Sequence, residues 1–244
     1  DVEQVLSDQN WLSIGRRLGV SLNDAPAWQI AKTDTFLFVY EQLAHCQQNS
    51  VSGMLCDRAD IGKTFTAKNY VRDNKNAVYI DCSQVKSRQK LIRKIAQEYG
   101  VNHTGKYADV YADLVYYLQS IVSPLVVLDE AGDLDYPAFL ELKALWNATE
   151  GVCAWYMMGA DGLKAKIESN KSRLKVGFAE IFSRFGSNYQ KVSPDGKEAL
   201  EQFSKMQLAL VVKANIPDAN IQQVYAQTLG SLRKTFDYAK KIRA

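Results

Sequence analysis

The sequence predicts an α/β fold, in which a parallel β-sheet is flanked by helices and followed by a small helical domain. Short apolar segments alternate with longer amphipathic segments through the middle of the chain. This alternation is typical of βαβ units, whose strands pair in parallel. After the turn Pro194-Asp195-Gly196 the strand pattern ends, and residues 197–243 keep only helical periodicity. The last part of the chain is therefore expected to be helical.

Strands and helices are expected in a regular order. The expected strands are residues 51–56, 77–82, 125–129 and 152–158. The expected helices that follow them are residues 63–71, 87–99, 109–121 and 136–149. In the second of these helices Leu91 and Ile95 share one face, and Gly100 follows as a stop. The C-terminal helical pattern is broken near Pro217 and Gly230.

The composition is that of a globular protein. Apolar residues make up 47% of the 244 residues and charged residues 23%, which excludes a mainly disordered or fibrous chain. We expect an N-terminal arm or linker over residues 1–34, an α/β core over residues 35–192 and a helical lid over residues 193–244. The formal net charge of +3 neither requires nor excludes a nucleic-acid partner, so the positions of the charges matter more.

The sequence predicts a cytoplasmic protein with no membrane partner. No segment has the run of about eighteen apolar residues that a membrane span needs. The first four residues, Asp-Val-Glu-Gln, are acidic and polar, so no signal peptide is expected. The four cysteines lie far apart and form no C-x-x-C pair, which indicates reduced core thiols rather than a zinc site: Cys46, Cys56, Cys82 and Cys153.

The loop between the first strand and the first helix has the pattern of a phosphate-binding loop. Residues 57–64, Asp-Arg-Ala-Asp-Ile-Gly-Lys-Thr, match G-x-x-x-x-G-K-[ST] except at the first position. Such a loop turns backbone N–H groups toward phosphate at a helix start, and adds a lysine for the phosphates and a hydroxyl for Mg²⁺. The sequence therefore predicts binding of ATP and Mg²⁺. The expected binding residues are Asp60, Ile61, Gly62, Lys63, Thr64 and Phe65.

Two aspartates depart from this pattern. Asp57 replaces the opening glycine, and Asp60 stands where many such loops carry another glycine. Both lack the freedom of glycine at positive φ, and both bring negative charge toward an anionic ligand. We therefore expect a weaker ATP affinity than is usual for such loops, and tighter binding after Asp60→Gly.

The most apolar expected strand ends in two acids, Asp129 and Glu130. Such a strand end places one carboxylate beside Mg²⁺ and the next where it can polarise an attacking water. Asp129 lies 65 residues after Thr64, with one strand and two helices between them. This is the order of elements that a nucleotide hydrolase requires. Thr64 and Asp129 are the predicted Mg²⁺ ligands.

With these two motifs the chain resembles the AAA+ ATPases, and more narrowly the DNA-transposition regulators of the MuB and TnsC class. The resemblance runs from about Trp28 to the C-terminus, and its most specific parts are residues 61–64, 128–132 and 156–163. It implies a P-loop AAA+ core with a parallel β-sheet flanked by helices, followed by a small C-terminal helical lid. It also implies that Lys63 contacts phosphate and that Glu130 is the catalytic base.

Three further residues receive roles from the resemblance. Asp161 is the nearest candidate for the polar sensor after the fourth strand, where the family more often has an amide or a hydroxyl. Arg184 falls where the family carries an arginine finger that reaches the γ-phosphate of a neighbouring subunit. Arg233 resembles the second sensor, which contacts the γ-phosphate from the lid. The two arginines together imply a homo-oligomer, although spacing alone also allows two ordinary helix arginines.

Two basic clusters are candidates for a DNA surface. The first follows the second strand, in a region that faces the central channel in ring-forming or filament-forming ATPases of this type: Lys86, Arg88, Lys90, Arg93 and Lys94. The second follows the fourth strand: Lys164, Lys166, Lys171, Arg173 and Lys175. Lysine and arginine neutralise phosphates independently of base sequence, so DNA binding is expected to be largely nonspecific. Each cluster can also be read as a solvated helix face.

The resemblance implies an ATP-dependent ATPase that assembles on double-stranded DNA, as a ring or a helical filament, and recruits or stimulates a transposase for target selection. One alternative is a helicase-loader or initiator-type ATPase of replication. Another is an assembly module that binds nucleotide without hydrolysing it.

Overall fold

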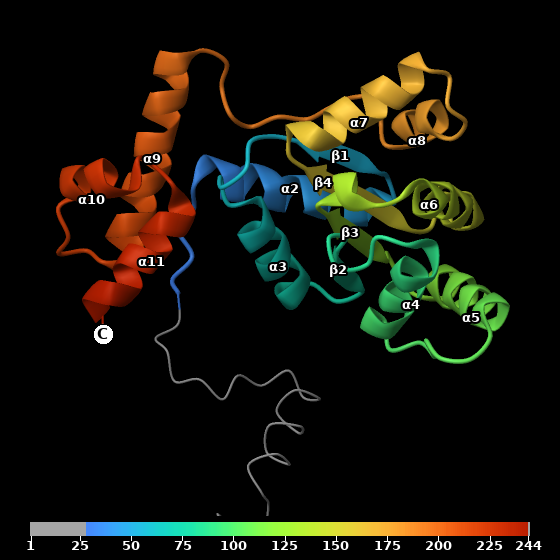
Figure 1. Cartoon of the computed structure of the whole chain (residues 1–244). Helices are drawn as coiled ribbons and strands as arrows, with labels where there is room; N and C mark the ends of the chain where they lie inside the picture. Colours follow the sequence, from blue (N-terminus) through green and yellow to red (C-terminus); the bar gives the residue numbers. More distant parts are fainter. Residues whose placement is uncertain (1–27, 244) are drawn as a thin grey trace, which may run out of the picture. The chain divides into compact units, whose positions relative to one another are not determined.

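Four parallel strands and the helices that connect them make up the core of the structure, a computed structural model that describes residues 28–243 (Figure 1). The strands are β1 (Gly53–Cys56), β2 (Ala77–Asp81), β3 (Leu125–Asp129) and β4 (Ala154–Gly159). They form one sheet in the order β1-β4-β3-β2. The predicted α/β fold with a parallel sheet flanked by helices is confirmed.

Seven helices and one short 3₁₀ helix between residues 34 and 184 accompany the sheet. They are α2 (Asp34–Asn49), α3 (Lys63–Asp73), α4 (Arg88–Glu98), α5 (Tyr107–Ser120), η2 (Ala131–Asp133), α6 (Tyr136–Ala148), α7 (Asp161–Ser172) and α8 (Phe178–Arg184). Each predicted helix is present, with its ends shifted by one or two residues. None of the helices among residues 28–243 is long and apolar enough to cross a membrane.

Alternation along the strands divides the core between the two faces of the sheet. Leu128 and Trp155 point to one face, where the apolar sides of α4, α5, α6, α7 and α8 cover them. Their neighbours Val127 and Tyr156 point to the other face, against α2 and α3. Both faces are covered, so the strands are continuous apolar runs, as buried parallel strands require. All four cysteines are buried in these two clusters, which confirms them as core thiols.

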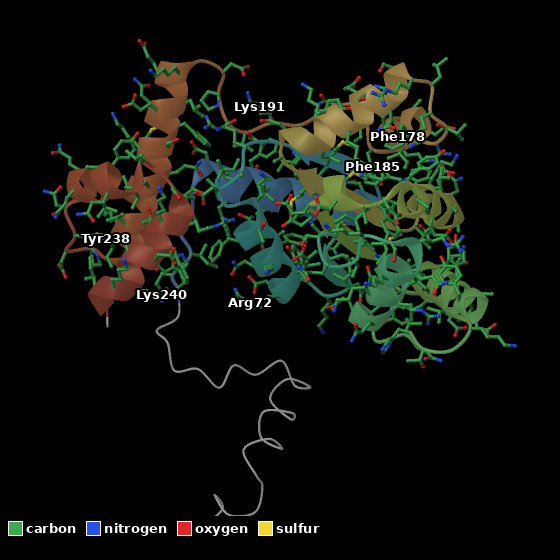
Figure 2. The ribbon with its side chains drawn as sticks, in the orientation of Figure 1. Arg72, Phe178, Phe185, Lys191, Tyr238 and Lys240 are labelled. Carbon is green, nitrogen blue, oxygen red and sulfur yellow. The ribbon has the colours of Figure 1, made fainter. Side chains whose placement is uncertain are left out.

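Helix α8 closes one side of the larger cluster. Phe178 begins the helix and Phe185 follows its last residue, and both side chains are 1% exposed (Figure 2). The Phe178 ring lies 5.2 Å from the ring of Phe139 on α6. These aromatic contacts fix α8 against α6, and with it the arginine at the end of α8.

Two features of the core were not predicted. Residues 34–49 form helix α2, which begins where the Thr33 hydroxyl accepts a hydrogen bond from the Phe36 N–H at 3.1 Å. Beyond the edge strand β1, Gln190 makes a single parallel bridge with Leu55. A bridge of one residue leaves no strand pattern in the sequence. The predicted N-terminal arm, residues 1–34, lies almost entirely outside the described residues.

The C-terminal part contains three helices that contact one another, α9 (Lys197–Asn215), α10 (Ile221–Thr228) and α11 (Leu232–Arg243). Leu208 and Val212 of α9 and Val224 of α10 are buried. The breaks fall where the sequence predicts them, since α9 ends before Pro217 and α10 ends before Gly230.

Candidate nucleotide site

The sheet brings the two predicted motifs to one edge. The carboxyl ends of parallel strands lie together, and ligands commonly bind outside them in α/β folds. The loop of residues 57–62 leaves the carboxyl end of β1, and Asp129 is the last residue of β3. Only β4 separates these two strands. The first turn of α3 can therefore reach the end of β3.

Thr64 and Asp129 are in direct contact. The Thr64 hydroxyl donates to Asp129 Oδ2 at 2.6 Å. Beside it, the Lys63 ammonium donates to the backbone carbonyls of Asp57 at 2.7 Å and Arg58 at 2.5 Å. Gly62 makes this turn possible, because its φ of 101° is in a region that favours glycine. The predicted lysine and hydroxyl therefore lie together at the start of α3.

Tyr79 is a site residue that the sequence analysis missed. Its phenol donates to Asp129 Oδ2 at 2.9 Å, the same oxygen that Thr64 contacts. Asp129 Oδ1 accepts from the Glu130 N–H at 3.0 Å, so both oxygens are fixed. Burial and the Asp129 charge raise the pKa of Tyr79 far above its ordinary value, which keeps the phenol a donor. Its sequence signal, an aromatic residue in a strand, is the same as that of a core residue.

Glu130 follows Asp129 with a strained backbone and an exposed side chain. Its φ of 49° is uncommon for a residue other than glycine and is found often at functional sites. Desolvation and the neighbouring Asp129 raise the pKa of the Glu130 carboxyl above its ordinary value, against the opposing charge of Lys63. A carboxylate with a raised pKa is the better proton acceptor.

The oxygens of Thr64 and Asp129 suit Mg²⁺. Mg²⁺ prefers hard oxygen ligands and usually takes only one or two from the protein, with phosphate and water supplying the rest. Across residues 28–243 no group of three or more His, Cys, Asp or Glu side chains could hold a metal by itself. A hydroxyl and a carboxylate at the head of a phosphate loop therefore fit an ion that arrives with a nucleotide.

Comparison with known proteins agrees with this geometry. Residues 47–167, just under half of the chain, match a protein family described as AAA domain. This part of the chain is therefore similar to an AAA domain. No curated protein sequence matches the chain.

Solved structures resemble the fold of this chain at low sequence identity. The Aeropyrum pernix Orc1 protein in complex with DNA matches with a TM-score of 0.56 and 16% identity, over 79% of this chain and 51% of that one. The Thermotoga maritima RuvB Holliday junction branch migration motor matches with a TM-score of 0.49 and 14% identity, over 88% of this chain and 62% of that one. The chain thus spans about half the length of the Orc1 protein.

The structure corrects the expectation that Asp57 faces the phosphates. Its carboxylate is 1% exposed and points away from the loop interior, toward the segment before α9. It accepts hydrogen bonds from the N–H groups of Val192 at 2.7 Å and Ser193 at 2.8 Å, and from the Ser193 hydroxyl. Burial alone would raise the pKa of Asp57, but the hydrogen bonds from Ser193, Val192 and Arg58 outweigh it, and the pKa lies below its ordinary value.

The structure corrects the expectation for Asp60 as well. Its carboxylate accepts hydrogen bonds from the Ser231 hydroxyl and from the Arg233 N–H, the latter at 2.8 Å. Both partners belong to the start of α11, so the charge is compensated outside the loop. The backbone of Asp60 does adopt the conformation that glycine favours, with φ of 65°. Repulsion between the Asp60 carboxylate and the phosphates is therefore no longer a reason to expect weak ATP binding. Asp60→Gly is expected to remove these hydrogen bonds rather than to tighten ATP binding.

The remaining predicted loop and sensor residues lie at this edge. Ile61 is buried, whereas Phe65 is 37% exposed on the first turn of α3. Asp161 begins α7 directly after β4 and is exposed. It lines a cavity of about 450 Å³ together with Arg58 and Ser193. Asp161 is thus beside the loop, but it makes no hydrogen bond to Lys63 or Thr64 among the contacts of the described residues.

Arg184 lies at the opposite edge of the sheet. Its Nε donates to Asn147 Oδ1 at 2.7 Å, and its guanidinium lies 5.3 Å from the centre of the Trp146 ring. Trp146 Nε1 in turn donates to Ser52 Oγ at 3.0 Å, just before the amino end of β1. The phosphate loop leaves the other end of that strand. Arg184 is therefore not brought together with Lys63 of its own chain.

The backbone of Arg233, by contrast, lies beside the phosphate loop, in the first turn of α11. Its N–H is held by Asp60, and its side chain is exposed. The preceding Leu232 places its Cδ1 3.8 Å from the position that a Cβ on Gly62 would take. The first turn of α11 thus contacts the loop at two points.

The first basic cluster is largely open to solvent. Lys86, Arg88 and Lys90 are exposed. Lys86 pairs with Asp133 at 3.1 Å, and Arg88 lies 5.3 Å from the ring centre of Tyr107. The other two members serve local structure, since Arg93 donates to the carbonyls of residues 103 and 105, and Lys94 pairs with Glu98.

The second basic cluster needs a correction. Lys166 donates to the carbonyls of Gly132 and Leu134 and lies over the Phe139 ring at 5.0 Å. Its ammonium therefore stabilises the turn after β3 rather than facing a ligand. Lys164 is exposed, with its ammonium 5.4 Å from the ring centre of Tyr189.

We predict that Asp57→Asn lowers the free energy of unfolding at pH 7 by about 1–3 kcal/mol, because hydrogen bonds to a buried charge are removed. The folded-state pKa of Asp57 is depressed. Its stabilisation is therefore present above the unfolded pKa of about 4 and disappears as pH falls through the folded value. Chemical unfolding of parent and variant between pH 3 and pH 7 measures this difference, which should shrink below about pH 4. The exposed Asp218→Asn is the control, and equal stability of Asp57→Asn and parent at pH 7 would contradict the anchor role.

Proposed function

We propose that this chain is a Mg²⁺-dependent ATPase that assembles on DNA. The contact between Thr64 and Asp129 carries the proposal. Two motifs 65 residues apart supply a hydroxyl and a carboxylate that meet at 2.6 Å. This contact lies at the start of helix α3, beside Lys63, whose ammonium donates hydrogen bonds to backbone carbonyls of the loop. This arrangement suits the binding of a nucleoside triphosphate together with Mg²⁺.

Each residue has a defined part in the proposed reaction. Thr64 and Asp129 would hold Mg²⁺, which when bound neutralises charge on the phosphate oxygens. Tyr79 keeps Asp129 oriented. Lys63 exchanges its carbonyl contacts for the β- and γ-phosphates. Glu130 accepts a proton from the attacking water, and its raised pKa suits that task.

The proposal includes a homo-oligomer, either a ring or a helical filament. Arg184 sits at the edge of the sheet opposite the phosphate loop, so it can complete only the site of another subunit. A site shared in this way makes hydrolysis depend on assembly. Arg233 approaches from the same chain, through the start of α11.

DNA is the proposed ligand of the assembled form. Lys86, Arg88 and Lys90 are exposed and follow β2, at the same edge of the sheet as the loop. They can neutralise phosphates without reading bases. The Orc1 structure that shares the fold is a complex with DNA, which is consistent with this proposal. The finer proposal is that the DNA-bound oligomer recruits or stimulates a transposase, and ATP-dependent stimulation of strand transfer is its direct test.

For Glu130→Gln we expect ATP binding to be retained and turnover to fall at least about a hundredfold, because an amide cannot accept the proton. Complexes with DNA should persist longer, since hydrolysis no longer ends them. Steady-state turnover with and without DNA is the measurement, and exposed Glu150→Gln is the matched control. Unchanged turnover in Glu130→Gln would remove this residue from the role of base. No turnover in the parent would favour the non-hydrolysing assembly module.

Mixing two inactive variants tests the shared site. Lys63→Ala should lose ATP binding, and Arg184→Ala should bind ATP without turning it over. When the two proteins are mixed, an intact Lys63 of one subunit meets an intact Arg184 of the next, and a fraction of the parental turnover should return. ATPase assays at fixed total protein measure this recovery. A mixture as inactive as its components would contradict completion of the site between subunits.

The DNA surface is tested by charge removal. Changing Lys86, Arg88 and Lys90 together to Ala should weaken binding equally for all duplex sequences and flatten the dependence of log affinity on log salt, by about 0.9 for each phosphate that the variant no longer neutralises. Titration at several salt concentrations gives this slope. The control changes the exposed Lys205, Lys213 and Lys240 to Ala, which removes the same amount of charge. An equal effect of both variants would place the DNA surface elsewhere.

A further inference from the structure

The carboxylate of Asp60 belongs to the phosphate loop by sequence but contacts the last helix of the chain. Oδ1 accepts from the Arg233 N–H at 2.8 Å, and Oδ2 accepts from the Ser231 hydroxyl. The two partners lie 171 and 173 residues further along the chain. This contact therefore bridges the nucleotide loop and the C-terminal helices.

The contact caps helix α11. The first N–H groups of a helix have no partner within it, and a carboxylate near this end is favoured by the helix dipole. Asp60 takes the N–H of Arg233, and the Ser231 hydroxyl, held by Asp60, accepts from the N–H of Lys234 at 3.1 Å. A residue of the phosphate loop thus caps the start of helix α11.

Other contacts tie the same parts together. Leu232 lies against Gly62, the residue that precedes Lys63. Asp57, at the other end of the loop, holds the backbone of residues 192 and 193 before α9. Both loop acids that depart from the glycine pattern therefore bind the C-terminal part of the chain. Glycine would suit the positive φ of residue 60 better, but it cannot make this contact.

We propose that Asp60 is a positioning residue that couples the phosphate loop to helix α11. It holds the start of α11, and with it Arg233, beside the bound phosphates, so that a change in the loop on ATP binding reaches the C-terminal helices. This inference rests on the proposed function, because it assigns the signal to ATP in the same loop.

The experiment compares four proteins: the parent, Asp60→Ala, Asp60→Asn and Asn220→Ala. Asn220 caps the neighbouring helix α10, where its Oδ1 accepts from the N–H groups of Gln222 at 2.9 Å and Gln223 at 3.1 Å. Its replacement removes a cap of the same kind that does not contact the loop. Hydrogen exchange of the full chain is measured without nucleotide, with Mg²⁺-ATP and with Mg²⁺-ADP, and the two nucleotide affinities are measured by titration.

In the parent, ATP should slow exchange both in residues 57–64 and in residues 231–235. In Asp60→Ala the second segment should exchange faster without nucleotide, and ATP should slow exchange only in the first. The preference for ATP over ADP should fall about tenfold, the effect of losing one hydrogen bond to a charged acceptor. Asp60→Asn keeps an acceptor oxygen and should retain most of the coupling. Asn220→Ala should speed exchange only at the start of α10.

Three results would overturn the inference in distinguishable ways. If ATP slows exchange in residues 231–235 of Asp60→Ala as it does in the parent, Asp60 does not couple the two parts, while the proposed function stands. If Asn220→Ala loses the ATP preference to the same extent, the effect is a general weakening of the helices. If ATP slows exchange nowhere in the parent, the inference and the proposed ATP site both fail.

Discussion

The candidate site depends on the hydrogen bonds that the Asp129 carboxylate accepts. This carboxylate is buried at the end of a strand, where an unpaired charge would be costly, and its oxygens are met by Thr64, Tyr79 and the N–H of Glu130. These contacts join the middle of β2 and the end of β3 to the first turn of α3. The proposed metal ligand is thereby held in place by the same hydrogen bonds that make its burial tolerable.

The phosphate loop depends on a second set of carboxylate contacts, which face outward. Asp57 and Asp60 have the charge that a phosphate site should avoid, yet both are turned away from the ligand side and are matched by donors of the C-terminal part. Their position therefore links the conformation of the loop to the segment before α9 and to the start of α11. A loop built with glycine would be more flexible and would lack this link.

The two arginines differ in their position relative to the phosphate loop. Arg233 begins a helix that rests on the loop of its own chain, whereas Arg184 is held by Asn147 and Trp146 at the far edge of the sheet. The amino ends and the carboxyl ends of the strands lie one strand length apart. Under the proposed function, Arg233 therefore serves the site within its own chain, and Arg184 serves the site of a neighbouring subunit.

The sequence by itself determined the alternation of strands and helices, because period and apolar character are local properties, and it placed Lys63, Thr64 and Asp129 in the correct order. The tertiary structure alone decided where side chains point. Tyr79 resembled a core residue, Lys166 resembled a free cation, and Asp60 resembled a misplaced charge until their partners, which are distant in sequence, were brought beside them. A hydrogen bond between residues far apart in the chain leaves no periodic trace, so only the packed fold could reveal it.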